Sequence, residues 1–387
     1  MKKLILHVGF HKTATSSIQS TLANNRLILN GQGFEYPSFN RHGDEIINHS
    51  IPFYSVFCEE PKLYHINIKN GDNNNIEEAN NDYSTQIEHS LDTERDVIIS
   101  GEDISMLSEK KLFALKNYIV GKGYQLKVFC CVRRPYPFTC SELQEQIKSG
   151  NGTLENILVP RKSEYVKKLM RVFGDVVQFS NFEDDCKADI GVVATFLRRI
   201  GVRSEDIELQ NSNEGFGNQA TRVLSFLNQH HPNIVNGQIN PKGRGIFSKS
   251  VDNNKFLLTQ TELRAIKEQL DDENESLKEL LGEKFCDEKY DSVSSSNISL
   301  SLANEIIKEY SKPHTLDTLI LYLVKNGNFD LIQFFNTNKF SVETYRNVAI
   351  SLKSAAPDKA FQFVRQAKLL RPNGPLINEI YDELSNI

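Results

Sequence analysis

The first two dozen residues constrain the fold of this chain more than any other segment. Leu4–Val8 is a short apolar run that stops at Gly9, and Ser16–Asn24 places Ile18 and Leu22 one helical turn apart. The sequence therefore predicts a strand, a tight loop and a helix in direct succession. The first backbone N–H groups of such a helix point toward one place, and the helix dipole adds partial positive charge there. This arrangement favours the binding of an anion.

Later segments repeat the alternation of strand and helix. Leu126–Val132 is apolar except for Lys127, which is typical of a strand covered on both faces. Other predicted strands are Asp96–Ser100 and Val176–Phe179, and predicted helices are Glu109–Val120, Pro137–Lys148, Ser163–Phe173 and Ile190–Ile200. Strands that alternate with helices indicate a parallel sheet, so the predicted fold class is α/β, a P-loop-like parallel sheet flanked by helices.

Two polar segments interrupt this pattern. Glu35–His65 scatters Tyr, Phe and Pro among polar residues and is predicted to be irregular. Asn70–Ser84 is rich in asparagine and acidic residues, which predicts a surface loop or an insertion.

The length and the C-terminal part indicate a second domain. A chain of 387 residues is long for one compact domain, since domains commonly hold ~100–200 residues. Asn218–Asn228 and Thr261–Leu281 are predicted helices, and a serine-rich break follows at Ser292–Ser296. Every segment beyond that break has helical periodicity, so a C-terminal all-α module is expected.

Charge, hydropathy and cysteine content exclude several classes of protein. The 45 basic and 50 acidic residues give a net charge of −5, which does not suit a protein that binds nucleic acid duplexes. No apolar run approaches the ~18–20 residues of a membrane span, and the N-terminal apolar stretch is too short for a signal peptide and lacks a cleavage site. The six cysteines form no CxxC pair or zinc-ligand spacing, so we expect reduced thiols, no metal and a cytoplasmic location.

The loop Gly9–Ser17 carries the first chemical motif. Lys12 supplies a full positive charge, and Thr13, Thr15, Ser16 and Ser17 supply hydroxyl groups. An ordinary helix capped by Ser or Thr is the structural alternative. The loop lacks the Gly-x4-Gly-Lys-Ser/Thr spacing of a Walker A motif, which a P-loop nucleotide kinase, the runner-up function, should show.

Lys12–Ser16 resembles the 5′-phosphosulfate loop of sulfotransferases, which usually reads Lys-Thr/Ser-Gly-Thr-Thr, and His7–Gln19 is similar to bacterial carbohydrate-type members. Ala14 stands where the family usually has glycine. Alanine is disfavoured at positive φ, so we expect a negative φ there or some energetic cost. The residues that this resemblance implies in cofactor binding are Gly9, His11, Lys12, Thr13, Ala14, Thr15, Ser16 and Ser17.

A second motif follows the strand Leu126–Val132. Arg133-Arg134-Pro135 matches the Arg-x-Pro of the family's 3′-phosphate motif, and Ser141 lies eight residues after Arg133, as that motif requires. Arginine offers a planar fork of donors to a phosphate. A solvated strand end is the alternative. The two motifs each follow a strand, and ligands of open α/β sheets bind outside the carboxyl ends of strands.

A weaker match lies downstream. Phe179–Asp184, followed by Phe196-Leu197 and Gly201, resembles the family's Tyr-Glu-Asp and Phe-Leu-Gly, so Phe182 is a candidate to stack on adenine. A core aromatic is an equally good interpretation of Phe182. Lys242–Gly245 is either a further phosphate loop or a polar turn between helices.

The resemblance implies a sulfotransferase. Such an enzyme moves a sulfuryl group from 3′-phosphoadenosine 5′-phosphosulfate to a hydroxyl of a saccharide-type acceptor, such as a surface polysaccharide or glycolipid precursor, without a metal. Lys12 would stabilise the leaving oxygen, Thr13 and the hydroxyls that follow would hold the 5′-phosphate, and Arg133 and Ser141 would hold the 3′-phosphate.

A general base is also expected, because the attacking hydroxyl should lose its proton. Glu102, which follows the strand Asp96–Ser100, is the first candidate, His49 the second and His11 the third. A carboxylate at the start of a helix is the structural alternative for Glu102.

The resemblance covers about Met1–Phe285, so we predict a sulfotransferase domain over 1–288 and a helical domain over 296–387. The positions Ala360, Val364, Ala367 and Pro372 resemble the second helix of a tetratricopeptide repeat, and Tyr345, Val348, Ala349 and Leu352 resemble its first helix. The helices could then bind a protein partner, whereas a generic bundle docked on the catalytic domain is the alternative. A non-catalytic scaffold with a dead nucleotide fold is the alternative to an enzyme.

Overall fold

A parallel sheet organises the N-terminal part of the computed structural model, which describes residues 1–210, 215–236, 238–294 and 298–385. The strand order is β2-β5-β1-β6-β7, and Leu6 of the central strand pairs with Ile99 and Val128 on either side. The fold class predicted from the sequence, α/β with a parallel sheet and a C-terminal helical region, is confirmed. The strands are β1 (Lys3–His7), β2 (Phe34–Glu35), β5 (Asp96–Ser100), β6 (Gln125–Val132) and β7 (Val177–Asn181).

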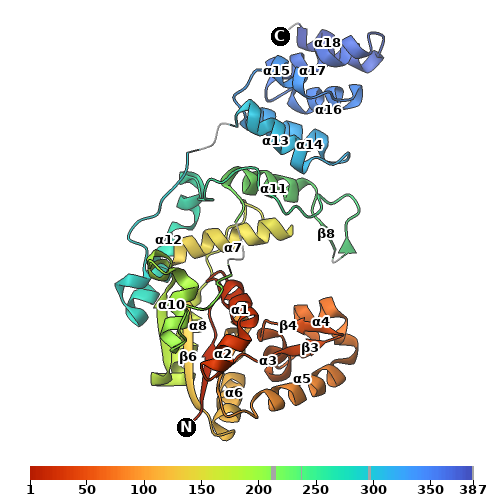
Figure 1. Ribbon diagram of the computed structural model, residues 1–387. Helices are drawn as coiled ribbons and strands as arrows, with labels where there is room; N and C mark the ends of the chain where they lie inside the picture. The colour runs from red at the N-terminus through yellow and green to blue at the C-terminus, as the bar shows by residue number, and fades with distance from the viewer. Residues whose placement is uncertain (211–214, 237, 295–297, 386–387) are drawn as a thin grey trace. The chain divides into compact units, whose positions relative to one another are not determined.

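Both faces of the sheet are covered. Leu4 and Leu6 of β1 belong to one buried cluster, and Ile5 between them belongs to another, as expected of a strand with apolar residues on both faces. Figure 1 shows helices packed along the strands. The helices that follow the strands in this part are α1 (Thr15–Asn24), α2 (Arg26–Gly31), α6 (Glu109–Gly121), α8 (Lys162–Phe173), α9 (Phe182–Lys187) and α10 (Gly191–Ile200).

The segment between β2 and β5 is more regular than predicted. The predictions of an irregular Glu35–His65 and a surface loop over Asn70–Ser84 are wrong, since a hairpin and several helices occupy these residues. A narrow apolar stripe explains the error for α5. Ile76, Ala79, Tyr83 and Ile87 are buried, and all the remaining positions of the helix are polar. The elements are β3 (Phe39–Arg41), β4 (Asp44–Ile46), α3 (Ser50–Phe57), η1 (Pro61–Leu63), α4 (His65–Asn70), η2 (Asp72–Asn75), α5 (Ile76–Ser90) and η3 (Glu102–Met106).

The chain forms two compact units. The first holds Met1–Phe138, Val159–Asn213 and Glu268–Lys289, and the second holds Thr139–Leu158, Glu214–Lys267 and Tyr290–Ile387. Two helices, α7 (Pro135–Ser149) and α12 (Gln260–Leu281), run across this division. The predicted domains 1–288 and 296–387 stay a prediction.

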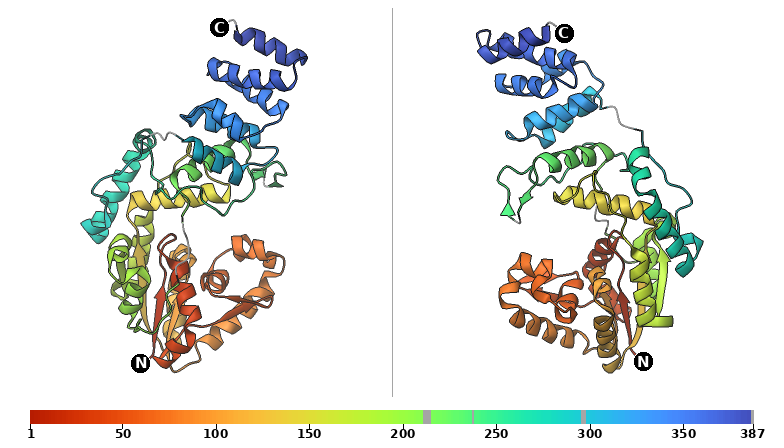
Figure 2. Two further views of the ribbon diagram at one scale, coloured as in Figure 1. Left: turned by 45° about the horizontal axis from the view of Figure 1, so that its top comes forward. Right: turned by 180° about the vertical axis from the view of Figure 1, so that it is seen from behind.

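The second unit ends in a series of helices. Figure 2 shows the C-terminal helices following one another as a stack. Tyr345, Val348, Ala349 and Leu352 are buried on α16, and Ala360, Val364 and Ala367 are buried on α17, so these positions form packing faces. The likeness to a tetratricopeptide repeat stays a prediction. The helices of the unit are α11 (Asn218–His230), α13 (Leu300–Tyr310), α14 (Leu316–Asn326), α15 (Leu331–Thr337), α16 (Val342–Leu352), α17 (Pro357–Leu370) and α18 (Pro375–Ser385), and β8 (Ile234–Val235) pairs with β9 (Gln238–Ile239).

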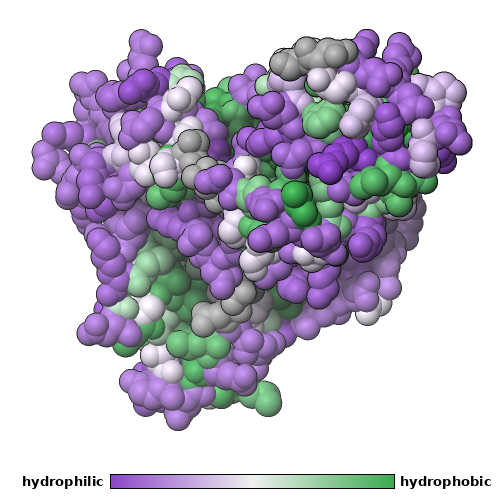
Figure 3. All heavy atoms as spheres, turned by 90° about the horizontal axis from the view of Figure 1, so that it is seen from above, coloured by the Kyte–Doolittle hydropathy of each residue, from purple (hydrophilic) through white to green (hydrophobic). Residues whose placement is uncertain are grey.

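Surface and thiol chemistry agree with the composition. Figure 3 shows mostly hydrophilic side chains on the face that it draws, with smaller hydrophobic patches between them. Within the described ranges, no helix combines the length and the apolar character that a membrane crossing needs. All six cysteines lie in those ranges as free thiols, and Cys58, Cys130, Cys131 and Cys140 are buried while Cys186 is exposed.

Candidate active site

The loop between β1 and α1 lies at the carboxyl edge of the sheet. Val8 N donates to Phe129 O at 2.9 Å, and Gly101 N donates to His7 O at 2.9 Å, so the loop starts between the ends of β6 and β5. Gly9 is required by close packing, because a Cβ there would lie 2.6 Å from Nε2 of the buried His7. The loop is thus placed where ligands of open α/β sheets bind.

Two residues of this loop have left-handed backbone conformations although they carry side chains. Lys12 has φ 65°, and Ala14, the N-cap of α1, has φ 62° and ψ 21°. The sequence predicts either a negative φ at Ala14 or an energetic cost, and the structure has the positive φ that carries the cost. A left-handed L-residue costs roughly 1–2 kcal/mol, and strain of this kind is concentrated at functional sites.

The start of α1 has hydrogen-bonding capacity for an anion. The N-cap is an alanine, which has no polar side chain to accept from the first N–H groups of the helix. Thr15 Oγ1 is buried and has no hydrogen-bond partner among the described residues, whereas Thr13 Oγ1 donates to Phe10 O and shapes the loop. Ser16 is exposed and Ser17 is buried. An uncapped helix start beside an orphaned buried hydroxyl fits the phosphate of a nucleotide donor.

Arg133 connects this loop to α9. Its Nη1 donates to Lys12 O at 3.1 Å, and its Nε lies 3.5 Å from Glu183 Oε1. The guanidinium carbon lies 5.0 Å from the centre of the Phe182 ring, which is partly exposed rather than part of the core. The structure therefore brings Arg133, Phe182 and the loop together. Ser141 lies on α7 in the second unit, and its joint action with Arg133 stays a prediction.

A cluster of acidic and basic groups flanks the loop on the side of β5. His11 Nε2 lies 3.0 Å from Asp103 Oδ1, and His11 Nδ1 lies 3.9 Å from Glu102 Oε1. Tyr64 donates its hydroxyl to Asp103 Oδ2 at 2.6 Å, and Gln19 Nε2 donates to Glu102 Oε2 at 3.3 Å. Two of the three predicted base candidates, Glu102 and His11, are therefore neighbours.

The environment of each group shifts its pKa. Burial alone would lower the pKa of His11, but the hydrogen bond with Asp103 and the charges of both carboxylates outweigh it and raise the pKa above 6.5. Burial works to raise the pKa of Asp103, yet the hydrogen bonds from His11 and Tyr64 lower it below 3.8. Burial raises the pKa of Glu102 above 4.5 despite the opposing charge of His11.

His49 is placed differently from the other base candidates. Its ring is fully buried and stacks on Tyr36, with ring centres 4.2 Å apart. Ser100 N donates to Nδ1 at 3.2 Å, and Nε2 lies 3.0 Å from Pro37 O, so both ring nitrogens are engaged. Burial lowers its pKa to about 3. This placement disfavours the interpretation of His49 as the base and makes it a packing residue.

A cavity of about 430 Å³ opens beside the cluster. His11 and Asp103 contribute to its wall, whereas Glu102 does not line it. The lining residues are His11, Tyr54, Cys58, Glu59, Glu60, Leu63, Tyr64, His65, Asp103 and Met106.

The structure adds polar groups that the sequence reasoning missed. Lys162, at the start of α8, has its Nζ 5.3, 4.6 and 5.0 Å from the ring centres of Phe10, Phe138 and Tyr165. Its charge opposes the protonation of His11. Asp103 was within reach of sequence analysis because it directly follows Glu102, whereas no local motif marks Lys162 or Tyr64.

The segment Lys242–Gly245 is a structural turn. Arg244 is fully buried, and its side chain donates to Gly245 O at 2.7 Å and to Ile147 O at 2.6 Å, besides Asn228 Oδ1. These partners engage the guanidinium within the second unit. The observation favours the turn over a further phosphate loop.

Comparisons with known proteins give one finding at the level of structure. No family model and no curated protein matches the chain. The solved structure of a sulfotransferase from Alicyclobacillus acidocaldarius is similar to it, with 13% sequence identity, a TM-score of 0.38, and coverage of 73% of this chain and 96% of that chain. A likeness at this score supports no inference about activity, so the proposals below rest on the residues described above.

Proposed function

We propose that this protein is a sulfotransferase that uses 3′-phosphoadenosine 5′-phosphosulfate and a saccharide-type hydroxyl acceptor. The observation that carries the proposal is the loop before α1, where a strained backbone, an uncapped helix start and the orphaned Thr15 hydroxyl converge. Arg133 donates to Lys12 O in the same loop and also lies over the Phe182 ring. Lys12, Arg133 and Phe182 are the residues that the sequence motifs assign to the binding of one nucleotide.

Each part of the nucleotide has candidate partners. The hydroxyls of Thr15, Ser16 and Ser17 and the loop N–H groups hold the 5′-phosphate. Gly9, His11, Thr13 and Ala14 shape the backbone, Thr13 by donating its hydroxyl to Phe10 O. The guanidinium of Arg133 and the hydroxyl of Ser141 hold the 3′-phosphate. The Phe182 ring stacks on the adenine. All of these roles are predictions from the sequence; the loop geometry supports those of the loop residues, and the contacts of Arg133 with Lys12 O and Phe182 support a shared site for these three.

When bound, the donor supplies a sulfuryl group whose sulfur forms a bond to the acceptor oxygen as its bond to the 5′-phosphate oxygen breaks. Lys12 offsets the negative charge that develops on the departing oxygen. Glu102 takes the proton of the acceptor hydroxyl, directly or through a neighbouring group, because its carboxylate lies in the cluster beside the loop. Lys162 adds a second cation close to His11.

His11 is the competing base. It lines the cavity, and its bond to Asp103 orients the ring as a carboxylate orients the histidine in other acid–base pairs. The two assignments differ in the pH at which activity is lost, which provides a test below.

Calorimetry with adenosine 3′,5′-bisphosphate, AMP and Mg²⁺–ATP tests the donor site. The bisphosphate should bind more tightly than AMP, and R133A should weaken its binding at least about tenfold, since a hydrogen bond to a charged group is worth ~1.5–3 kcal/mol. R134A is the matched control, because the Arg134 side chain donates to Lys284 O instead. Equal binding of AMP and the bisphosphate would remove the 3′-phosphate site, and preferential binding of Mg²⁺–ATP would favour a P-loop kinase.

Turnover separates an enzyme from a scaffold. A labelled sulfuryl donor incubated with glycan acceptors should yield labelled product, whereas a dead nucleotide fold would bind the bisphosphate and transfer nothing. The cytoplasmic location, the glycolipid or surface polysaccharide precursor, and a protein partner for the C-terminal helices stay predictions.

A further inference from the structure

The cavity beside His11 has aromatic walls. The rings of Tyr54 and Tyr64 have centres 4.7 Å apart at an angle of 42°, and the His65 ring lies 5.0 Å from Tyr64, edge to face. Tyr64 is held in place by its bond to Asp103 Oδ2. Leu63 and Met106, exposed at 68% and 46%, add apolar surface to the lining. A ligand in this cavity therefore meets aromatic and apolar side chains as well as polar ones.

The charged groups of the cavity are mostly acidic. Within the described residues its lining includes the carboxylates of Glu59, Glu60 and Asp103 and the imidazoles of His11 and His65, but no lysine or arginine. The Ser108 hydroxyl donates to Glu59 and lowers its pKa below 4.5, and Asp103 has a lowered pKa as well, so both are anionic at neutral pH.

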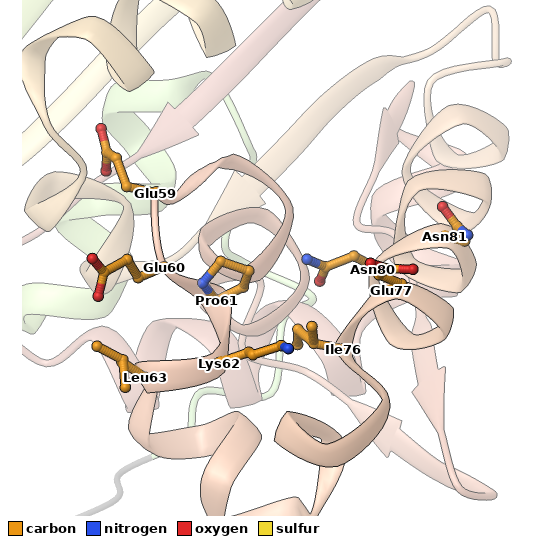
Figure 4. Close-up of a pocket in the computed structure, with 9 residues that line it drawn as sticks. All are labelled: Glu59, Glu60, Pro61, Lys62, Leu63, Ile76, Glu77, Asn80 and Asn81. Carbon is orange, nitrogen blue, oxygen red and sulfur yellow. The ribbon is translucent and has the colours of Figure 1, made fainter.

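A second cavity of about 800 Å³ shares part of its lining with this one, and Figure 4 shows the residues that line the second cavity. The side chains of Glu60 and Leu63 extend to one side of the segment Glu59–Leu63, and Lys62 extends to the other side, toward Ile76. Glu59, Glu60 and Leu63 line both cavities, whereas Lys62 and Glu77 line the second alone. The ammonium group of Lys62 thus lies toward Ile76, and Lys62 is not among the described residues that line the cavity beside His11.

Aromatic rings beside carboxylates form a recognition surface for an ammonium group, since both attract a cation. We propose that the cavity is the acceptor subsite and that it selects a hydroxyl compound bearing a protonated amine, such as an amino sugar. This inference rests on the proposed function. The volume of about 430 Å³ lies in the range of ~300–1,000 Å³ typical of small-ligand sites. An anionic sugar would be repelled, because the three carboxylates of Glu59, Glu60 and Asp103 outnumber the positive charge that His11 carries when protonated.

An acceptor series on one sugar scaffold tests the proposal. The methyl glycosides of glucosamine, N-acetylglucosamine, glucose and glucuronic acid would each be incubated with the full-length protein and a labelled sulfuryl donor, and kcat/KM determined at pH 7. The amine should give the highest value, the two neutral sugars lower values and the carboxylate the lowest. The preference for the amine should weaken as salt rises, because exposed charges are screened.

Variants of the lining decide whether these carboxylates cause the preference. E60Q should lower kcat/KM for the glucosamine glycoside about threefold to tenfold, a range set by the modest strength of exposed ion pairs, and should lower the ratio of that value to the value for glucose. E77Q is the matched control, because Glu77 is also exposed but lines only the second cavity. E59Q is less suitable, since Glu59 accepts from Ser108 at the start of α6.

The outcomes separate this inference from the proposed function. Binding of adenosine 3′,5′-bisphosphate by each protein is measured alongside. If the wild type fails to bind it, the proposed function fails. If the bisphosphate binds but glucuronide reacts as fast as glucosaminide, if E60Q and E77Q act alike, or if no glycoside of the series is labelled, the inference about the acceptor is overturned while the nucleotide site stands.

Discussion

The two sides of the candidate site are built in different ways. The side that we propose binds the nucleotide, called the nucleotide side, is a contiguous loop, Gly9–Ser17, whose backbone is held by strand ends and strained at Lys12 and Ala14. The side that we propose binds the acceptor, called the acceptor side, is assembled from side chains far apart in sequence, with Asp103 bonded to His11 at 3.0 Å and to Tyr64 at 2.6 Å. A backbone loop recognises a phosphate whatever the rest of the ligand is, whereas an assembled pocket can change its ligand by single substitutions. Donor chemistry should therefore be more resistant to mutation of side chains than acceptor choice.

The largest expected effect is on the acceptor side. E102Q keeps the shape of the side chain and its bond from Gln19 but removes its basicity, so kcat should fall about 10²–10⁴-fold, the usual worth of general-base help. The affinity for adenosine 3′,5′-bisphosphate should stay nearly unchanged. Single-turnover rates and calorimetry on the same preparation measure the two quantities.

The pH profile then identifies the base. A base must be deprotonated, so activity falls as pH drops through its pKa. With Glu102 as the base the midpoint lies above 4.5, and with His11 it lies above 6.5, because burial raises the first pKa and Asp103 and Glu102 raise the second. Three results would assign the base to His11 instead. E102Q would keep full activity, H11Q would be inactive, and D103N would move the midpoint of the pH profile to lower pH.

On the nucleotide side, K12A should lower kcat about 10²–10³-fold, as does the loss of a single group that stabilises developing negative charge. Binding of the bisphosphate should weaken much less, because the charge acts mainly as the leaving oxygen departs. Equal losses in turnover and in binding would make Lys12 a binding group alone. K162A provides the comparison, since Lys162 lies among three rings beside the loop rather than within it.

Much of the nucleotide side could be predicted from the sequence, because its parts are local. The strands end where apolar runs end, and the loop, Arg133 and Phe182 follow those strands directly. The tie between Arg133 Nη1 and Lys12 O joins two such segments, so it depends on the sheet order that places β6 beside β1.

The acceptor side could not be predicted in the same way. The helix α5 carries a single apolar stripe among polar residues, and the asparagines around it favoured a loop. Tyr64 and Asp103 meet only because the segment between β2 and β5 folds back on β5, which no local pattern encodes. His49 shows the limit of sequence patterns in another way: its residue type suggested a base, but the structure buries its ring and engages both nitrogens, which disfavours that role.

Two buried histidines should make stability depend on pH. Burial lowers the pKa of His49 to about 3 and of His7 to about 4, so the unfolded chain binds more protons below pH 6.5. Stability is then lost as pH falls, and each group should contribute a loss of about 2 kcal/mol between pH 7 and pH 5. Urea unfolding at both pH values measures this loss, which H49Q should reduce. The exposed His89 is the control, and an H89Q variant with the same effect would contradict the assignment.

The smallest expected effect concerns the strain of the loop. Ala14 has φ 62° and ψ 21°, where its Cβ costs roughly 1–2 kcal/mol, and glycine would remove that cost. Glycine also gains freedom in the unfolded chain, which offsets about 0.4–1 kcal/mol of the benefit. A14G should therefore stabilise the fold by about 1 kcal/mol or less, seen as a higher urea midpoint at an unchanged m-value. A23G, within α1, should have the opposite sign because glycine weakens a helix interior and loses a buried methyl.

If A14G instead destabilises the protein, the left-handed conformation at position 14 does not strain the loop. If it stabilises the protein but weakens bisphosphate binding, the alanine restricts the loop to the conformation that holds the phosphate, and the nucleotide side depends on that rigidity.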